Sequence, residues 1–356
     1  MTKISAKVIA DSKNEFGNRI TTMIVTFPRF ILAELNTHRM MSRNSASSRA
    51  IPFEKMIASV ENDPFVPIAF QKDHKGMQGT EYLEGAQLEL ALQAYGRSVD
   101  SAIQKAKEFA ATDATKQLVN RQLEPYMWHT VIITATEWEN FFALRCPKYD
   151  FNSDIYRSRK DVLKHYPSPG LEDDTMYWLS MNKGQAEIHM MELAEQIWDA
   201  MNESTPKELK AGEWHIPFGD DIEILQEDLI LASSNRREIK ISVEESIKEK
   251  IKIATARCAR VSYTVVGEED KPANYENDIK LHDRLSASGH WSPFEHCAKA
   301  MSEDERVERV NGIKSLTHSE KGYPDIYDDT TIQGWSGNFK GFIQYRKTFN
   351  NENITK

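Results

Sequence analysis

Residues 34–52, ELNTHRMMSRNSASSRAIP, concentrate hydrogen-bond donors in a chain that is acidic overall. The segment holds one histidine, three arginines, two asparagines and five hydroxyl side chains. An arginine guanidinium is a planar fork of donors that matches a phosphate or a pyrimidine edge, and serine and asparagine add neutral donors. The segment therefore predicts a site for an anion with an attached ring system. A solvated polar loop is the alternative for such a Ser/Arg-rich stretch.

Two arginines and a cysteine farther along the chain could join this chemistry. Arg121 and Arg145 flank a β-rich segment, and each could clamp a phosphate or be an ordinary surface arginine. Cys146 follows Arg145, and a neighbouring guanidinium lowers the pKa of a thiol. No partner base can be assigned to this thiol, so we expect a small buried residue rather than a nucleophile.

The segment SGHWSPFEH, residues 288–296, places two histidines and a carboxylate in one turn. Such a group could bind a metal or transfer protons. The spacing HxxxxEH matches no zinc-binding helix, and Pro293 disfavours a regular helix at this point. We therefore expect no metal site. The chain also lacks the glycine-rich loops that hold dinucleotides or nucleoside triphosphates in Rossmann and Walker folds.

Two strand-like segments surround the donor-rich segment in the sequence. Residues 21–35, TTMIVTFPRFILAEL, lead directly into it and are broken by Pro28. Residues 130–136 form a second β-rich run, followed by an aromatic, helix-like turn. That the donor-rich segment follows directly on a strand-like run argues against a simple solvated loop.

Helices and irregular segments account for much of the rest. Residues 82–120 are the longest stretch with helical periodicity, which Gly96 could divide in two, and residues 185–202 predict an amphipathic helix. Residues 146–183 are polar, without clear periodicity and too long for an ordinary connection, so we expect an insertion or lid. Residues 203–241 predict a linker region around GEWHIPFGDD, whose function the sequence leaves open.

Composition narrows the class of protein. A net charge of −9 argues against a general nucleic-acid-binding surface, so an anionic ligand needs a local basic pocket. Three cysteines form neither a disulfide framework nor a metal-ligand spacing, which is typical of a reducing cytoplasm. No apolar run approaches the roughly 18 residues that span a bilayer, and the N-terminus lacks a signal-peptide core. We expect a soluble cytoplasmic protein with no nucleic-acid or membrane partner.

Together, five motifs resemble those of the flavin-dependent thymidylate synthases. That family carries RHRxxSxNxxSxR, and residues 37–49 read THRMMSRNSASSR, which differs only at the first arginine. The family's ARVSY, GHxSPFEH and NFxxLR segments match residues 259–263, 289–296 and 140–145. Its AQxEI segment matches residues 184–188, with Gly in place of Ala.

The order of the motifs differs from the common family order, in which ARVSY and SPFEH precede the histidine–arginine motif. The chain thus resembles a circularly permuted, divergent member, an arrangement that is tolerated when the old termini lie close together. In that case residues 338–347, NFKGFIQYRK, are expected to form a strand beside the one that ends at Glu34.

The resemblance implies one α+β domain over residues 1–356, a mixed sheet packed with long helices, and a homotetramer with active sites between subunits. It implies reductive methylation of dUMP at C5, with FAD as cofactor and NADPH and 5,10-methylenetetrahydrofolate as co-substrates, and no cysteine nucleophile. The implied flavin contacts are His38, Arg39, Asn44, Asn140, Ser262, His290, Ser292 and Glu295. The implied nucleotide contacts are Glu34, Ser47, Ser48, Arg49, Arg121 and Arg145, of which Ser47, Arg49 and Arg145 are expected to serve catalysis.

The chain departs from the family pattern at several site positions. Thr37 replaces an arginine, and Glu34 replaces a glutamine near the nucleotide, where a carboxylate repels a phosphate by about 1 kcal/mol if solvent screens it. Further departures are Ser45, Thr134, Thr136 and Lys183. Two alternatives therefore remain open: a related hydroxymethylase acting on dUMP or dCMP, and a catalytically inactive protein that binds flavin or nucleotide.

Overall fold

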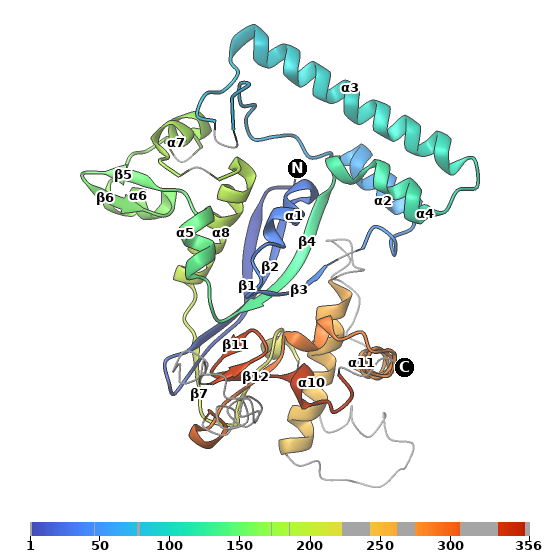
Figure 1. Cartoon of the computed structure of the whole chain (residues 1–356), viewed down its shortest axis with the longest axis vertical. Coiled ribbons are helices and arrows are strands. Elements are labelled where there is room, and N and C mark those ends of the chain that lie inside the picture. Colours follow the sequence, from blue (N-terminus) through green and yellow to red (C-terminus); the bar gives the residue numbers. More distant parts are fainter. Residues whose placement is uncertain are drawn as a thin grey trace, which may run out of the picture.

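The computed structural model describes residues 2–45, 47–76, 79–171, 173–184, 186–222, 243–261, 275–306 and 334–352. Its centre is a five-stranded sheet in the order β3-β4-β2-β1-β7 (Figure 1). Neighbouring strands are antiparallel except β1 and β7, which are parallel. These strands are β1 (Ser5–Asn14), β2 (Arg19–Pro28), β3 (Ser42–Ser45), β4 (Trp128–Ala135) and β7 (Lys207–Leu209). A mixed sheet packed with helices confirms the α+β class.

The other elements surround this sheet. The helices are α1 (Leu32–Leu35), α2 (Phe53–Asn62), α3 (Gly85–Ala110), α4 (Lys116–Val119), α5 (Glu139–Arg145), α6 (Arg159–His165), α7 (Thr175–Met181), α8 (Ile188–Glu203), α10 (Val243–Arg260) and α11 (Tyr275–Ser288). The 3-10 helices are η1 (Arg29–Ile31), η2 (Asn120–Gln122), η3 (Glu124–Tyr126), η4 (Gly219–Asp221), η5 (Ser292–Glu295) and η7 (Tyr345–Thr348). The remaining strands are β5 (Tyr149–Phe151), β6 (Asp154–Tyr156), β8 (Trp214–His215), β9 (Ala298–Ala300), β10 (Trp335–Ser336), β11 (Phe339–Lys340) and β12 (Phe342–Gln344).

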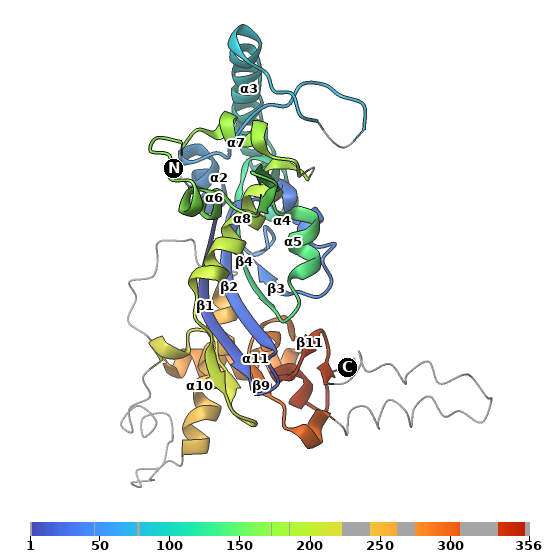
Figure 2. The ribbon, with the colours of Figure 1, turned by 90° about the vertical axis from the view of Figure 1, so that its left-hand side faces the viewer.

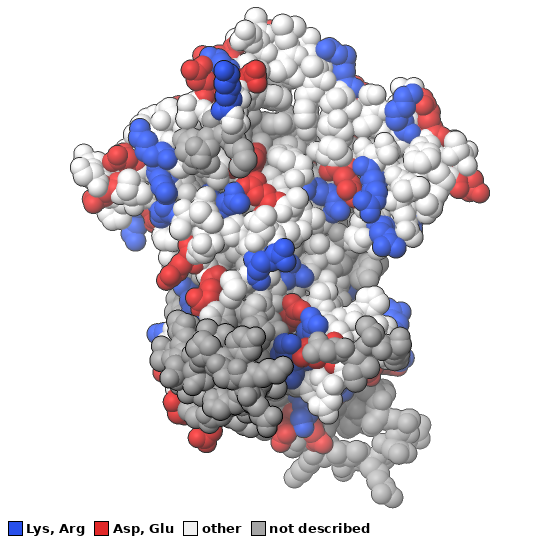
Figure 3. Space-filling model, viewed as in Figure 1, with Lys and Arg blue, Asp and Glu red and all other residues white. Residues whose placement is uncertain are grey.

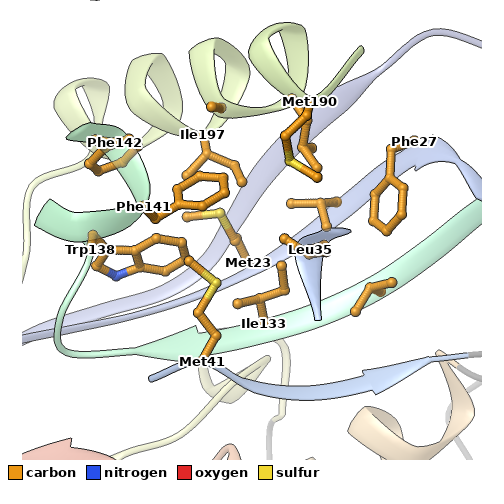
Figure 4. Close-up of a cluster of buried hydrophobic side chains, with 14 of the residues drawn as sticks. Met23, Phe27, Leu35, Met41, Ile133, Trp138, Phe141, Phe142, Met190 and Ile197 are labelled. Carbon is orange, nitrogen blue, oxygen red and sulfur yellow. The ribbon is translucent and has the colours of Figure 1, made fainter. Parts of the chain in front are cut away.

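The main hydrophobic core lies between the sheet and the helices α5 and α8. Successive side chains of a strand point to opposite faces, so Met23 of β2 and Ile133 of β4 share the face that these helices cover. They pack there with Phe141 of α5 and with Met190 and Ile197 of α8 (Figure 4). The predicted strand at 130–136 and the predicted helix at 185–202 are confirmed.

The first predicted strand ends earlier than expected. Strand β2 stops at Pro28, and η1 and α1 follow, so Glu34 lies in a short helix rather than in a strand. The reason is local, because proline has no N–H for a further ladder bond. The prediction of a strand that continues to Leu35 was therefore wrong.

Helix α3 projects at one end of the molecule, and its C-terminal half packs on α2 (Figure 2). It runs through Gly96 without a break, so the possible division there is absent. Glycine costs a helix about 1 kcal/mol relative to alanine, which packing at Val99 and Ala106 can offset.

Residues 146–183 form a small lobe with its own hydrophobic cluster around Tyr149, Val162 and Trp178. The lobe contains α6, α7 and the hairpin β5–β6, secondary structure that its sequence did not indicate. Its two ends meet where Tyr149 bridges to Asn182 and Lys183 N–H donates to the Lys148 carbonyl (2.7 Å). The lobe is also tied to α8, because Arg159 pairs with Glu192 and Glu195 of that helix. The insertion and its role as a lid both stay predictions.

The predicted linker region at 203–241 contains structure in its described part. Strand β7 extends the central sheet, and β8, within GEWHIPF, pairs with β9. Residues 223–241 lie outside the described residues.

The C-terminal segment 338–347 does not pair with β2, the strand that was expected to continue to Glu34. It forms β11 and β12, and β12 pairs with β9. Gly341 lies against the β1–β2 turn, where its carbonyl accepts from Asn14 Nδ2 (2.8 Å) and a Cβ would lie 2.3 Å from Asn18 Oδ1. The prediction of a strand beside the one that was expected to end at Glu34 was wrong, because both edges of β2 are paired, with β1 and β4. Phe339 and Phe342 pack against Ile20 of β2 instead. The circular permutation stays a prediction. Among the described residues, no helix is long and apolar enough to cross a membrane.

His129 of β4 predicts a pH dependence of stability. Burial and the neighbouring Arg29 lower the pKa of His129 to about 3. Between the ordinary pKa of 6.5 and this value, the unfolded chain holds a proton that the native chain lacks, so stability falls as the pH falls through this window. In urea titrations at several pH values from 6.5 to 4, the acid-induced loss should be shallower for His129→Gln, by up to about 1.4 kcal/mol per pH unit. Equal slopes for variant and wild type would contradict this assignment.

Candidate functional site

Arg145, the last residue of α5, joins two of the predicted segments. Its Nε donates to Nε2 of His38 (3.1 Å), and its Nη1 pairs with the Glu34 carboxylate. His38 is buried and packs edge-on against the ring of Phe141, with centroids 5.0 Å apart. Because Nε2 accepts from arginine, His38 is neutral and carries its proton on Nδ1. The pKa of His38 agrees with a neutral ring, because burial and the charges of Arg145 and Arg43 all lower it.

The surroundings of Glu34 act on the pKa of its carboxyl group in opposite directions. Burial raises the pKa of this carboxyl group, Arg145 lowers it, and Glu187 raises it further. The side chains of Glu34 and Arg145 are about one-quarter exposed, so the pair borders solvent. The Glu34 carboxylate thus offsets the positive charge of the Arg145 guanidinium. A ligand at Arg145 must bind beside Glu34 or displace it.

Arg43 is a functional candidate that the sequence did not single out. Its Nη1 donates to the carbonyl oxygens of Leu35 and His38, both at 2.9 Å, and so holds the turn that presents His38. Burial and the charge of Arg39 lower the pKa of Arg43, while Glu295 raises it. Arg43 occupies a variable position of the motif, so only its charge inside a donor-rich segment could have indicated it.

Strand β3 and the turn η5 bring a second group together. Ser292 Oγ donates to Asn44 Oδ1 (3.1 Å), and Asn44 Nδ2 donates to the Cys258 carbonyl (2.9 Å). Glu295 pairs with Nη1 of Arg346 (2.5 Å), a residue of the C-terminal segment that sequence analysis left unassigned. Three of the implied flavin residues, from parts of the chain some 250 positions apart, therefore lie at one interface.

The remaining implied flavin residues are exposed or lie outside the described residues. Arg39, Asn140 and His290 are exposed, and His290 Nδ1 lies 2.9 Å from Ser288 Oγ. Asn140 shares α5 with Arg145. Ser262 lies outside the described residues.

A third group forms around Gln117 of α4. Arg49 Nε donates to the side-chain oxygen of Gln117 (3.1 Å), and Arg121 Nε donates to its backbone carbonyl (3.2 Å). Ser47 Oγ accepts from the Arg49 backbone N–H (3.3 Å), and buried Ser48 donates to Glu124 (2.5 Å). Arg49 and Arg121 are both exposed, so this group offers two cations to solvent.

The implied nucleotide residues thus fall into two groups within one chain. Figure 1 shows α4 and α5 on opposite sides of the sheet, with Gln117 on the first and Arg145 on the second. On the face drawn in Figure 3, basic and acidic side chains alternate rather than forming one continuous basic surface.

All three cysteines are buried, which confirms the expectation for Cys146. Cys146 donates from Sγ to the Arg157 carbonyl (3.4 Å), and burial raises the pKa of its thiol to about 12. A thiol in this state is a poor nucleophile. The described residues contain no group of three or more His, Cys, Asp or Glu side chains arranged to hold a metal ion.

No protein-family model matches the chain, and no curated protein matches it. Among solved structures, the UMP/dUMP methylase PolB from Streptomyces cacaoi is similar in two complexes. The complex with 5-Br UMP has a TM-score of 0.40 and 13% identity, over 57% of this chain and 90% of that one. The complex with 5-Br dUMP has a TM-score of 0.40 and 12% identity, over 57% and 91%. Similarity at this level assigns neither a family nor an activity to the chain.

Proposed function

We propose that the chain is a flavin-dependent enzyme that methylates dUMP at C5. The observation that carries the proposal is the meeting of motif segments 34–49, 140–145 and 288–296 at β3 and its flanks. The contact of His38 with Arg145 spans 107 positions of sequence, and that of Asn44 with Ser292 spans 248. Segments that resemble one family's site in sequence thus contact one another in the fold, which supports the proposal.

The donors at this site fit FAD. Arg39 is an exposed cation that suits a diphosphate, and the exposed side chains of Asn140 and His290 suit the polar edge of a flavin ring. Asn44 and Ser292 would border the ring from β3 and η5. FAD reduced by NADPH supplies hydride, and 5,10-methylenetetrahydrofolate supplies the one-carbon unit.

Arg145 is the residue that we assign to the pyrimidine. A guanidinium has five N–H donors. Nε and Nη1 serve His38 and Glu34, and Nη2 is the group that we expect to meet a carbonyl oxygen of the base. Drawing negative charge toward that oxygen stabilises the state in which C5 attacks. Glu34 and His38 then orient the guanidinium.

The division of the nucleotide residues supports an active site between subunits. Arg49 and Arg121 lie with α4, apart from Arg145 on α5. In a homotetramer, the phosphate-binding pair of one copy could face Arg145 of another. We propose this arrangement for the phosphate and the base of one nucleotide.

Glu34 favours a second candidate reaction. Its carboxylate can accept from N3–H of uracil or from the N4 amino group of cytosine, so the base could be either. Capture of the one-carbon unit by water instead of hydride would give a hydroxymethyl product. A hydroxymethylase acting on dUMP or dCMP is therefore the first alternative. A protein that binds FAD without turnover is the second.

Replacing Arg145 tests the proposal. Protein reconstituted with FAD should oxidise NADPH in a manner that requires dUMP and methylenetetrahydrofolate. Arg145→Ala should lower this turnover by about 100-fold or more, because a charge-stabilising donor is lost, while the flavin absorbance stays. Arg97→Ala, at an exposed position of α3, is the matched control and should change neither. A wild-type protein that takes up no FAD contradicts the proposed function, and loss of flavin from Arg145→Ala contradicts the assignment of that residue.

Cys146→Ser tests the absence of a thiolate mechanism. A serine hydroxyl can replace the thiol as donor to the Arg157 carbonyl, so the fold should persist. Turnover should stay within about twofold of wild type, because a buried thiol with a raised pKa contributes no nucleophile. Complete inactivation, with circular dichroism and flavin content unchanged, would show that the thiol takes part in the reaction.

A further inference from the structure

A continuous chain of buried hydrogen bonds crosses the central sheet from GEWHIPF to the SPFEH turn. Ser12 Oγ lies 2.9 Å from His215 Nδ1, and His215 Nε2 lies 2.8 Å from Thr22 Oγ1. Thr22 Oγ1 lies 2.7 Å from Thr134 Oγ1, which lies 2.8 Å from His296 Nδ1. All five side chains are buried. We call this set the buried hydrogen-bond chain.

Neutral imidazoles can give this chain a single direction. Burial lowers the pKa of His215 to about 4 and that of His296 to about 3, so both rings are neutral at pH 7. A neutral ring donates from one nitrogen and accepts at the other, and a hydroxyl donates once. A hydroxyl can also accept twice, so all the bonds point the same way when Thr22 and Thr134 each donate within the chain. The tautomers of His215 and His296 are then coupled through these two hydroxyls.

His296 occupies the end of this chain at a cost. Its Nε2 is buried and has no hydrogen-bond partner among the described residues. An unsatisfied buried polar group is unfavourable, and an apolar side chain would fill this position without that penalty. A histidine here is better explained by what it positions than by packing.

The chain ends at the interface that holds the implied flavin residues. His296 directly follows η5, and Thr134 lies opposite Ser42 of β3 in the sheet. Two hydrogen bonds thus hold η5 on the sheet. His296 bonds to Thr134 of β4, and Ser292 bonds to Asn44 of β3. His296 thus links the end of η5 to the central sheet through Thr134.

We propose that His215 of GEWHIPF is a positioning residue that acts through Thr22 and Thr134 to fix the tautomer of His296 and the position of η5 on β3. The inference deepens the proposed function, because it takes η5 and β3 as one border of the flavin site. It also gives GEWHIPF a role and explains Thr134, which departs from the family residue near the flavin.

The tautomer of His296 can be measured without turnover. In protein labelled with ¹⁵N-histidine, the side-chain nitrogen shifts should show one tautomer for His296 in the wild type. Thr22→Val does not touch His296 but breaks the chain, so both tautomers should appear. Titration with FAD should show about tenfold weaker binding for Thr22→Val and Thr134→Val.

The matched control is a second threonine pair on the same strands. Thr26 and Thr130 of β2 and β4 also bond through their hydroxyls (3.1 Å), outside the buried hydrogen-bond chain. Thr26→Val and Thr130→Val should leave the tautomer and FAD affinity unchanged. His215→Gln, which can replace Nε2 toward Thr22, should preserve the His296 tautomer, whereas His215→Asn should not.

Two results separate the inference from the proposed function. If Thr22→Val leaves the His296 tautomer as in the wild type, or changes it no more than Thr26→Val does, the positioning role is overturned. If the wild type binds no FAD, the proposed function fails, and the tautomer measurement still decides whether His215 controls His296.

Discussion

Alternation of side chains along β4 is the constraint on which the rest of the structure depends. Val131 and Ile133 point into the core beneath α5 and α8, whereas Thr130 and Thr134 point to the other face. A shift of one residue would exchange the two sets and bury hydroxyls in an apolar core. The pairing of β4 with β2 on one side and β3 on the other fixes that register. The same strand thus supports the core and the polar chain that reaches η5.

Helix α5 brings the residues of the candidate site together on this scaffold. The helix follows β4 after a short turn, buries Phe141 against the sheet and ends at Arg145. Phe141 also contacts His38, so one helix positions both the guanidinium and the imidazole that accepts from it. Glu34 of α1 completes the group. Helix α1 follows the end of β2 at Pro28 and the short helix η1. The position of Glu34 in the candidate site therefore depends on the end of β2 at Pro28 as well as on the sequence of α1.

Part of this arrangement could be predicted from the sequence. Apolar, β-branched runs indicated β2 and β4, and motif resemblance indicated that residues 34–49 and 140–145 serve one site. The partners of Arg346 could not be predicted, because Glu295 lies 51 positions away in a different motif. His215 was equally hidden, since a lone histidine in a loop-like segment carries no periodic signal. Tertiary contacts determine the places of these residues. They also determine the helices of the 146–183 lobe, because the apolar residues of its small core recur at no regular interval in the sequence.

The most direct test of the account is the mass of the product. Protein reconstituted with FAD should be incubated with NADPH, methylenetetrahydrofolate and dUMP, and the nucleotide weighed by mass spectrometry. The account predicts a gain of one methylene unit, which marks replacement of the C5 hydrogen by methyl. A hydroxymethyl-sized gain, or a product only from dCMP, would contradict thymidylate synthesis and assign the Glu34–Arg145 pair to the alternative reaction. No product from either nucleotide, with FAD bound, would contradict catalysis itself.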